Sequence, residues 1–188
     1  MRRLSVFNNI SLDGYFTGAD GDFSWAHAGG DDAEWNAFVA GNASGGGALL
    51  FGRVTYELMA SFWPTSQARE QFPVVAERMN AMAKYVCSRT LDSAVWSNTT
   101  LMRGELLAEV RKLKHESGQD ITILGSGTIV AQLAAAGLID DYQCVVNPIA
   151  LGGGRSMFQG LPARLPLQLT ASRTFQNGKV LLSFVPVV

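Results

Sequence analysis

Three short segments of the sequence combine glycine with hydroxyl or arginine side chains, a combination suited to holding phosphate groups. Each segment directly follows an apolar run that is typical of a buried strand. The segments are Gly52-Arg53-Val54-Thr55, Ser88-Arg89-Thr90 and Gly125-Ser126-Gly127-Thr128-Ile129. Glycine lets a phosphate approach the backbone, and hydroxyl and guanidinium groups donate hydrogen bonds to phosphate oxygens. The sequence therefore predicts a site for a phosphate-bearing ligand, and a dinucleotide is the natural candidate.

The third segment lies between a predicted strand and a predicted helix. Ile121–Leu124 is a short apolar run, and apolar residues follow helical spacing from Thr128 to Gly137. At the start of such a helix, free backbone N–H groups and the positive end of the helix dipole favour an anion. A Rossmann fingerprint would also require a third glycine, where this chain has Val130, and an acidic residue about twenty positions later. Taken alone, the segment is equally compatible with a dinucleotide site and with an ordinary strand-to-helix turn.

The bulk composition limits the classes of partner. A chain of 188 residues with 47% hydrophobic and 16% charged residues fits one globular domain spanning residues 1–188. A net charge of -1, without a run of Lys and Arg, predicts no nucleic-acid partner and no membrane-surface partner. No apolar stretch is long enough to span a bilayer or to form a signal peptide at the N-terminus. Cys87 and Cys144 lie in apolar runs, so we expect reduced thiols in a cytoplasmic protein.

Other chemistries have no support in the sequence. His27 and His115 have no Cys or His partner at the spacing of metal ligands, so we expect no metal site. The sequence contains neither a G-x-S-x-G nucleophile elbow nor a lysine P-loop.

Apolar strands alternate with helices around the phosphate-suited segments. The predicted strands are Arg3–Ile10, Ala48–Phe51, Lys84–Cys87, Ala94–Ser97, Ile121–Leu124, Tyr142–Asn147, Leu165–Phe175 and Lys179–Val187. The predicted helices are one that is capped by Asp31 or Asp32 and ends at Gly41–Gly47, followed by Gly52–Phe62, Pro73–Met82, Glu105–Glu116 and Thr128–Ala136. Asn177-Gly178 is a two-residue hairpin signal, so the last two strands are expected to be antiparallel. This order predicts an α/β fold with a mostly parallel sheet and an antiparallel C-terminal hairpin.

The helix Glu105–Glu116 is amphipathic and is interpreted as scaffold. Leu106, Val110 and Leu113 are expected to point inward. The basic residues expected on its solvated face are Arg111, Lys112, Lys114 and His115.

Ligands of open parallel sheets bind beyond the carboxyl ends of the strands. The three phosphate-suited segments all begin at such ends, so we expect them to lie together on one edge of the sheet. The loop Gly18–Gly30 carries Phe23, Trp25 and His27 among glycines and aspartates, a composition typical of a lid over a ligand.

Five segments match a known family in order and spacing. They are NNISLDGYF, FGRVTYELM, KYVCSRTL, ILGSGTIVAQLAAAGLIDDY and NPIALGGGRSMF. Together they resemble the dihydrofolate reductase-like family and, within it, the reductase domain at the C-terminus of the bifunctional riboflavin-biosynthesis deaminase/reductase. The resemblance covers nearly the whole chain. It implies a three-layer α/β fold with a central mixed sheet, and a reductase that uses NADPH.

The resemblance also implies roles for individual residues. Positions that correspond to the family's cofactor site are Gly52, Arg53 and Thr55 at the phosphate junction, Ser88 and Arg89 near the adenosine 2′-phosphate, and Gly125, Ser126, Gly127, Thr128 and Ile129 at the pyrophosphate turn. Asp13 corresponds to a position beside the nicotinamide and the substrate. Asp32 falls near the substrate-binding acid of dihydrofolate reductases, although Asp31 and Glu34 fit the same alignment. A helix N-cap explains an aspartate there as well as catalysis does.

The sequence departs from the family pattern in two places. It lacks the deaminase domain with its zinc-ligand signature, and the loop from Gly18 to Asp32 replaces the proline-tryptophan substrate loop of dihydrofolate reductases. The expected function is hydride transfer from NADPH to a small heterocyclic or sugar-linked C=N or C=O substrate, of the 5-amino-6-(5-phosphoribosylamino)uracil reductase type. The alternatives are a dihydropterin or dihydrofolate reductase and a non-catalytic NADPH-binding protein.

Two further expectations concern the proton and the quaternary structure. The proton for the reduced substrate comes either from water or from an acid such as Asp32 or Asp13. Aromatic residues that either contact a flat substrate ring or belong to the ordinary core are Phe16, Phe23, Trp25 and Trp35. Related reductase domains form dimers through C-terminal strands, so the resemblance and the apolar edge of such strands predict a homodimer.

Overall fold

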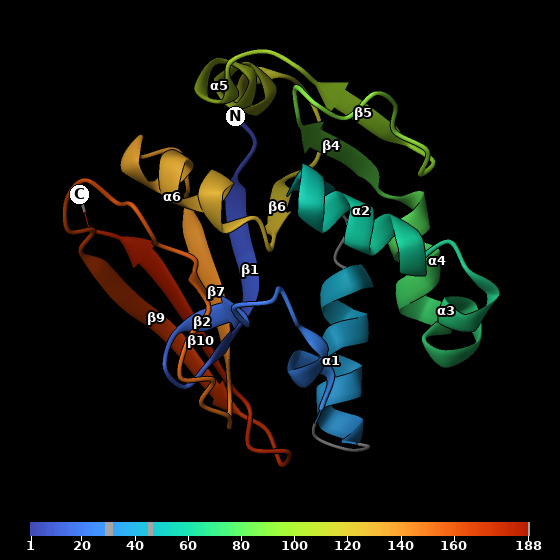
Figure 1. The fold of residues 1–188 in the computed structure, drawn as a ribbon, viewed down its shortest axis with the longest axis vertical. Coiled ribbons are helices and arrows are strands. Elements are labelled where there is room, and N and C mark those ends of the chain that lie inside the picture. The colour runs from blue at the N-terminus through green and yellow to red at the C-terminus, as the bar shows by residue number, and fades with distance from the viewer. Residues whose placement is uncertain (29–31, 45–46, 188) are drawn as a thin grey trace.

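A central eight-stranded sheet organises the chain (Figure 1). The structure, a computed structural model, describes residues 1–28, 32–44 and 47–187. The strand order is β5-β4-β3-β6-β1-β7-β10-β9. The strands are β1 (Leu4–Ser11), β3 (Ala48–Gly52), β4 (Ala83–Cys87), β5 (Thr99–Met102), β6 (Ile121–Leu124), β7 (Asp141–Asn147), β9 (Leu167–Thr174) and β10 (Val180–Pro186). All pairings among β1 and β3 to β7 are parallel, whereas β10 is antiparallel to both β7 and β9. The mostly parallel α/β sheet with an antiparallel C-terminal hairpin is therefore confirmed.

Helices cover both faces of the sheet and complete three layers. They are α1 (Ala33–Ser44), α2 (Arg53–Phe62), α3 (Ser66–Gln71), α4 (Pro73–Ala81), α5 (Leu106–His115) and α6 (Gly127–Ala135). On one face, Val110 of α5 and Leu133 of α6 belong to the buried cluster around Val6 and Ile123. On the other face, residues of α1, α2 and α4 pack in a second cluster around Phe51. Successive side chains of a strand point to opposite faces of the sheet. Because β1 lies between β6 and β7 near the middle of the sheet, both of its faces are covered by helices.

Some short elements were not predicted from the sequence. They are the strands β2 (Tyr15–Thr17) and β8 (Arg155–Ser156), the helix α3 and a single 3-10 turn at Ser24–His27. β2 and β8 pair with each other in a separate two-stranded sheet, which we call the flap. Elements of two to six residues are too short to produce a detectable hydrophobic period.

The predicted strand Ala94–Ser97 is wrong, because β5 begins later, at Thr99. The apolar character of the segment comes from Trp96, whose side chain fills the core of the α2 and α4 layer at 3% exposure. Its backbone N–H donates to the Tyr56 hydroxyl at 2.9 Å, and its indole N–H donates to Asn80 Oδ1 at 2.7 Å. A loop anchored by one buried aromatic residue has the same local composition as a short strand.

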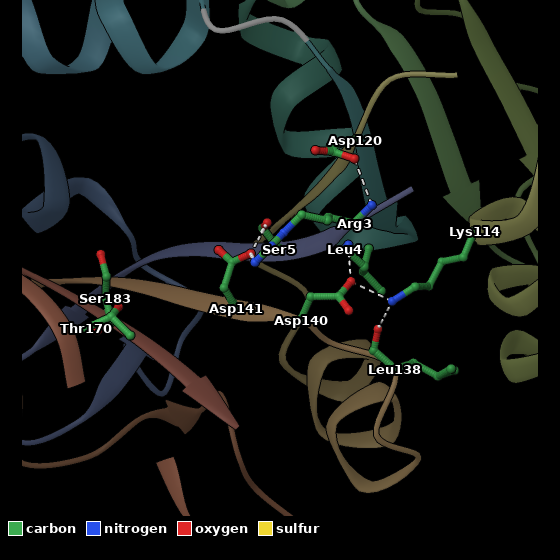
Figure 2. A network of polar contacts seen from close by, with 10 residues as sticks. All are labelled: Arg3, Leu4, Ser5, Lys114, Asp120, Leu138, Asp140, Asp141, Thr170 and Ser183. Atoms are coloured by element: carbon green, nitrogen blue, oxygen red, sulfur yellow. Dashed lines mark hydrogen bonds and ion pairs between the residues drawn. The ribbon is translucent and has the colours of Figure 1, made fainter. Parts of the chain in front are cut away.

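The predicted solvated position of Lys114 is also wrong. Its side chain is buried, and its ammonium group donates to the Leu138 carbonyl at 2.7 Å and to Asp140 Oδ2 at 2.6 Å (Figure 2). The same carboxylate oxygen accepts from the Leu4 backbone N–H at 2.6 Å. A polar tie therefore joins α5, the segment after α6 and the start of β1, and helical periodicity alone could not reveal that Lys114 has a buried partner.

Two more aspartates hold the amino end of β1. Asp120 Oδ1 accepts from the Arg3 backbone N–H at 2.7 Å, and Asp141 Oδ2 accepts from the Ser5 hydroxyl at 2.7 Å (Figure 2). This polar network lies at the amino ends of the parallel strands, so it stabilises the end of the sheet opposite the one where ligands of such sheets bind.

Candidate functional site

The turn between β6 and α6 has an unusual backbone. Gly125 and Ser126 have φ values of 59° and 58°, so two consecutive residues adopt the left-handed conformation. A non-glycine residue rarely adopts this conformation and usually requires support from its surroundings. Asn8 of β1 supplies that support, because its Oδ1 accepts from the Gly125 N–H at 2.6 Å and its Nδ2 donates to the Gly125 carbonyl at 3.2 Å. Asn8 is buried, and no local pattern in the sequence indicates this role.

The Ser126 hydroxyl joins this turn to the junction between β3 and α2. It accepts from the Gly52 N–H at 2.8 Å, while Thr55 Oγ1 accepts from the Ser126 N–H at 3.1 Å. The two hydroxyl oxygens are also 3.1 Å apart. The structure thus brings together two of the three predicted segments, and the Thr55 hydroxyl is engaged with Ser126.

The N-terminus of α6 presents open hydrogen-bond donors. The Ser126 carbonyl accepts from the N–H groups of Ile129 and Val130. Within the described part of the chain, the N–H groups of Gly127 and Thr128 have no acceptor. These two donors and the helix dipole together suit a phosphate or pyrophosphate group.

The glycines of this region are required by close packing. A Cβ on Gly125 would lie 2.8 Å from Thr55 Oγ1, and a Cβ on Gly52 would lie 3.2 Å from Ile129 Cδ1. A Cβ on Gly127 would lie 2.5 Å from the ring of Phe16, a residue of the flap. These glycines therefore let Thr55, Ile129 and Phe16 pack directly against the backbone at the start of α6.

A cleft of about 440 Å³ continues from α6 toward β4 and β5. It is lined by Cys87, Ser88, Arg89, Met102, Arg103, Gly104, Glu105, Leu106, Glu109, Ile129 and Gln132. We call it the Arg89 cleft. Its volume is within the range of small-molecule sites, roughly 300–1,000 Å³. Because Ile129 and Gln132 belong to α6, the cleft and the open N–H groups share one helix.

The cations of this region have different surroundings. Arg89 is exposed and has no hydrogen-bond or ion-pair partner among the described residues. Arg103, which sequence reasoning missed, donates to the Asp92 carbonyl at 2.8 Å and also lines the cleft. Arg53 is outside the lining and forms an exposed ion pair with Glu57 at 3.0 Å. Arg103 directly follows β5 and therefore also lies at the end of a strand. It was missed because the strand was predicted at Ala94–Ser97, five residues too early.

Ser88 shapes the loop that carries Arg89. Its hydroxyl oxygen accepts from the backbone N–H groups of Thr90 and Leu91 at 3.2 and 3.0 Å, which fixes a tight turn directly after β4.

Asp13 holds the flap region together through backbone hydrogen bonds. Its carboxylate accepts from the Ser11 hydroxyl at 2.6 Å and from the N–H groups of Leu151 and Gly152, the latter at 2.7 Å. The hydrogen bond from Ser11 and those from Leu151 and Gly152 lower the pKa of Asp13 to about 2. The carboxylate is therefore ionised near neutral pH, and its hydrogen bonds weaken only as the pH falls from about 3.8 toward about 2.

Asp32 caps helix α1. Its Oδ1 accepts from the N–H groups of Glu34 and Trp35, and its Oδ2 accepts from the N–H of Asn177 in the C-terminal hairpin turn. These bonds, the one from Trp35 foremost, lower the pKa of the carboxyl group. The geometry favours the capping role, and a catalytic role for Asp32 stays a prediction. Asp31, the other predicted cap, is outside the described residues.

The aromatic loop before α1 is tied to the sheet by Lys179. The ammonium of this buried residue donates to the Ala26 carbonyl and to Asn147 Oδ1, and lies 5.2 Å from the centre of the Trp35 ring. Burial lowers the pKa of Lys179. Trp25 is also buried, at 8% exposure, and borders a second, open cleft of about 540 Å³. The lining of that cleft is Gly18, Ala19, Asp20, Asp22, Trp25, Leu151, Gly152 and Gly153.

No helix in residues 1–28, 32–44 and 47–187 combines the length and the apolar character needed to cross a membrane. In the same residues, no three His, Cys, Asp or Glu side chains gather in a way that could hold a metal ion.

Comparison with known proteins identifies relatives of the whole chain. The family model described as the RibD C-terminal domain matches residues 2–181. The uncharacterized protein YyaP of Bacillus subtilis is 26% identical over 179 residues, which cover 95% of this chain and 92% of that protein.

Two solved structures show the same fold. The diaminohydroxyphosphoribosylaminopyrimidine deaminase/5-amino-6-(5-phosphoribosylamino)uracil reductase of Thermotoga maritima superposes with a TM-score of 0.69 at 13% identity, covering 99% of this chain and 57% of that one. Dihydrofolate reductase from Enterococcus faecalis, complexed with NADP(H) and RAB-propyl, superposes with a TM-score of 0.63 at 11% identity, covering 99% of this chain and 97% of that one. The fold is therefore dihydrofolate reductase-like, as the sequence resemblance implied.

Proposed function

The chain belongs to the RibD C-terminal domain family, and on this premise we propose that it is an NADPH-dependent reductase. The proposed substrate is a small heterocyclic or sugar-linked compound with a C=N or C=O group, of the 5-amino-6-(5-phosphoribosylamino)uracil type. The observation that carries the proposal is the arrangement along α6. The helix starts with two open N–H donors, and its next turn lines the cleft that contains the unpaired Arg89.

The residues fit NADPH in chemical type. The N–H groups of Gly127 and Thr128 would hold the pyrophosphate, and the guanidinium of Arg89 would form charge-assisted hydrogen bonds with the 2′-phosphate. Glycine at positions 52, 125 and 127 lets α2, α6 and the flap pack closely around the turn, which fixes the geometry of the start of α6. The relation to the Enterococcus faecalis enzyme, solved with NADP(H), supports the same assignment.

The protein's own contribution to the reaction is positioning. Bound NADPH supplies a hydride from its nicotinamide ring. The turn held by Asn8 and the flap held by Asp13 would fix the geometry of the ligand and limit the access of water. Since Asp13 and Asp32 both have lowered pKa values, we propose that water rather than either carboxylate supplies the proton.

Replacing Arg89 with alanine tests the cofactor assignment. We expect the affinity for NADPH to fall by about tenfold to a hundredfold, because a hydrogen bond to a charged group contributes about 1.5–3 kcal/mol. NADH has no 2′-phosphate, so its affinity is expected to change by less than about twofold. Tryptophan fluorescence titrations with both nucleotides measure the difference. Arg164→Ala removes an exposed arginine outside the cleft and is the matched control; equal losses for the two nucleotides would contradict the assignment.

A turnover assay separates the proposed activity from its alternatives. Oxidation of NADPH is followed at its absorbance with the aminopyrimidine ribosyl phosphate, and separately with dihydrofolate, as acceptor. Turnover of the first supports the proposal, whereas steady turnover of dihydrofolate that an antifolate inhibits supports a dihydrofolate reductase. If the protein binds NADPH but neither acceptor causes its oxidation, the result supports a non-catalytic NADPH-binding protein.

We also propose that the chain forms a homodimer through β9. This edge strand is eight residues long, and seven of its residues are exposed, including Leu169 at 51%. A long unpaired edge strand is a template for pairing with another chain. Analytical ultracentrifugation at micromolar concentration is expected to give twice the mass of one chain, and Leu169→Lys is expected to shift the population toward monomer. The control Val95→Lys, at a position 85% exposed in another part of the chain, should leave the dimer intact; a monomeric wild type excludes the dimer.

A further inference from the structure

The Arg89 cleft contains the carboxylate of Glu109, which lies against Gly104. A Cβ on Gly104 would overlap the carboxylate of Glu109, one turn into α5. Gly104 has no positive φ, so the conformation of its backbone does not require glycine. The Glu109 carboxylate occupies the space beside Gly104, between the end of β5 and the start of α5.

The neighbouring acid has a different task. The Glu105 carboxylate caps α5 by accepting from the N–H groups of Leu107 and Ala108 at 3.1 and 2.8 Å. The Glu105 carboxylate thus stabilises the positive N-terminal end of α5. The Glu109 carboxylate, in contrast, has no hydrogen-bond or ion-pair partner in the part of the chain that the structure describes, although Glu109 lines the same cleft.

The negative charge of Glu109 also affects a thiol at the end of β4. Burial, together with the negative charge of Glu109, raises the pKa of Cys87 to about 12. Cys87 is the last residue of β4 and also lines the cleft. The carboxylate therefore acts on the same end of β4 from which the Arg89 loop begins.

The cleft thus has both kinds of group that distinguish a ribose hydroxyl from a ribose phosphate. In nucleotide sites, a carboxylate accepts hydrogen bonds from the ribose 2′-hydroxyl, whereas an arginine accommodates a 2′-phosphate. Arg89 and Arg103 favour the phosphate, and no ion pair with either of them neutralises Glu109 among the described residues. The preference between the two cofactors is then a balance of opposing charges within one cleft.

We infer that Glu109 is a specificity-determining residue that lowers the preference for a nucleotide with a 2′-phosphate over one with a free 2′-hydroxyl. This inference rests on the proposed function. The carboxylate accepts a hydrogen bond from the ribose hydroxyl of NADH and repels the 2′-phosphate of NADPH. The chain accordingly binds both cofactors, with a smaller preference for NADPH than its two arginines alone would produce.

The experiment compares Glu109→Gln with the wild type in fluorescence titrations with NADPH and NADH, and in calorimetric titrations with 2′,5′-ADP and 5′-AMP. The ratio of the Kd for NADH to the Kd for NADPH is expected to rise by at least about tenfold, because one unit charge about 4 Å from a phosphate at an effective dielectric constant of about 20 is worth more than this before solvent and salt in the open cleft screen it. The two fragments should show the same change, since they contain only the ribose end. Gly104→Ala, which displaces the carboxylate, is expected to shift the ratio in the same direction. Glu116→Gln removes a charge at the other end of α5 and is the matched control.

The outcomes separate the inference from the function on which it rests. A wild type that binds NADPH, with a ratio that Glu109→Gln changes by less than about twofold, overturns the inference alone. A wild type that binds neither nucleotide overturns the proposed function and the inference with it. Circular dichroism of each variant verifies that the fold is retained, and Gly104→Ala gives a second, independent reading of the same carboxylate.

Discussion

Gly125→Ala is expected to lower the affinity for NADPH at least about a hundredfold, which corresponds to roughly 2.7 kcal/mol. Gly125 has a φ of 59°, a conformation that costs a residue with a Cβ about 1–2 kcal/mol. In addition, the new methyl group would lie 2.8 Å from Thr55 Oγ1 and 2.9 Å from its Cγ2. Relief of these contacts must move Ser126, whose N–H donates to the same threonine. Fluorescence titration with NADPH measures the loss.

Gly137→Ala is the matched control for this variant. Gly137 follows the other end of α6 with a φ of 64°, and nothing lies within 4 Å of the position its Cβ would take. It therefore has the same backbone strain without the contact at Thr55. We expect a loss of stability of about 1 kcal/mol and an unchanged affinity for NADPH. If both variants weakened binding equally, the turn would have no special part in holding the cofactor.

Asp140→Asn is expected to lower the free energy of unfolding by about 3 kcal/mol, because it leaves the ammonium of Lys114 buried without its counter-charge. The ammonium lies 2.6 Å from Asp140 Oδ2, and its side chain is only 5% exposed (Figure 2). The hydrogen bond to the Leu138 carbonyl remains, so we expect the low end of the range for a broken buried ion pair. Urea unfolding followed by circular dichroism measures the change.

Asp141→Asn provides the comparison for the ion pair. Asp141 pairs with Arg3 at 3.4 Å, and the Arg3 side chain is 61% exposed, so this variant is expected to lose at most about 1 kcal/mol. The double variant Asp140→Asn/Lys114→Met removes both charges and should recover most of the loss, since replacement of a buried pair by apolar groups is often neutral. A loss for Asp140→Asn no larger than for Asp141→Asn would show that Lys114 is solvated in solution.

Much of the fold could be predicted from local sequence. The strands Ile121–Leu124 and Lys84–Cys87 and the helix Glu105–Glu116 are apolar or amphipathic with a clear period, and the structure contains them within one residue of the predicted ends. Asn177-Gly178 lies in the turn between β9 and β10 as predicted, but the loop is longer than a two-residue turn: the Phe175 N–H donates to the Lys179 carbonyl, and Gly178 has a positive φ whereas Asn177 does not. Trp96 produced an error for the same reason that these predictions succeeded. A short apolar run has the same appearance in the sequence whether it forms a strand or anchors a loop.

The candidate site was predicted only in part. Glycines and the residues at strand ends are visible in the sequence, so the turn at Gly125 and the loop of Arg89 could be named. Asn8, Arg103 and Glu109 could not, because their importance depends on what lies opposite them. Asn8 is separated from Gly125 by 117 positions, and no local pattern indicates such a contact.

Hydrophobic period and glycine placement are local properties of a chain, so the α/β class, the strand-glycine-helix junctions and the edge of the sheet where they gather follow from the sequence. Which polar groups are free, in contrast, depends on contacts between distant segments. The tertiary structure engages the Thr55 hydroxyl with Ser126, buries Lys114 beside Asp140, and leaves Arg89 and Glu109 facing one cleft. Whether a polar group binds a ligand or holds the fold together depends on the partners that folding brings within hydrogen-bond distance, and those partners come from distant parts of the chain.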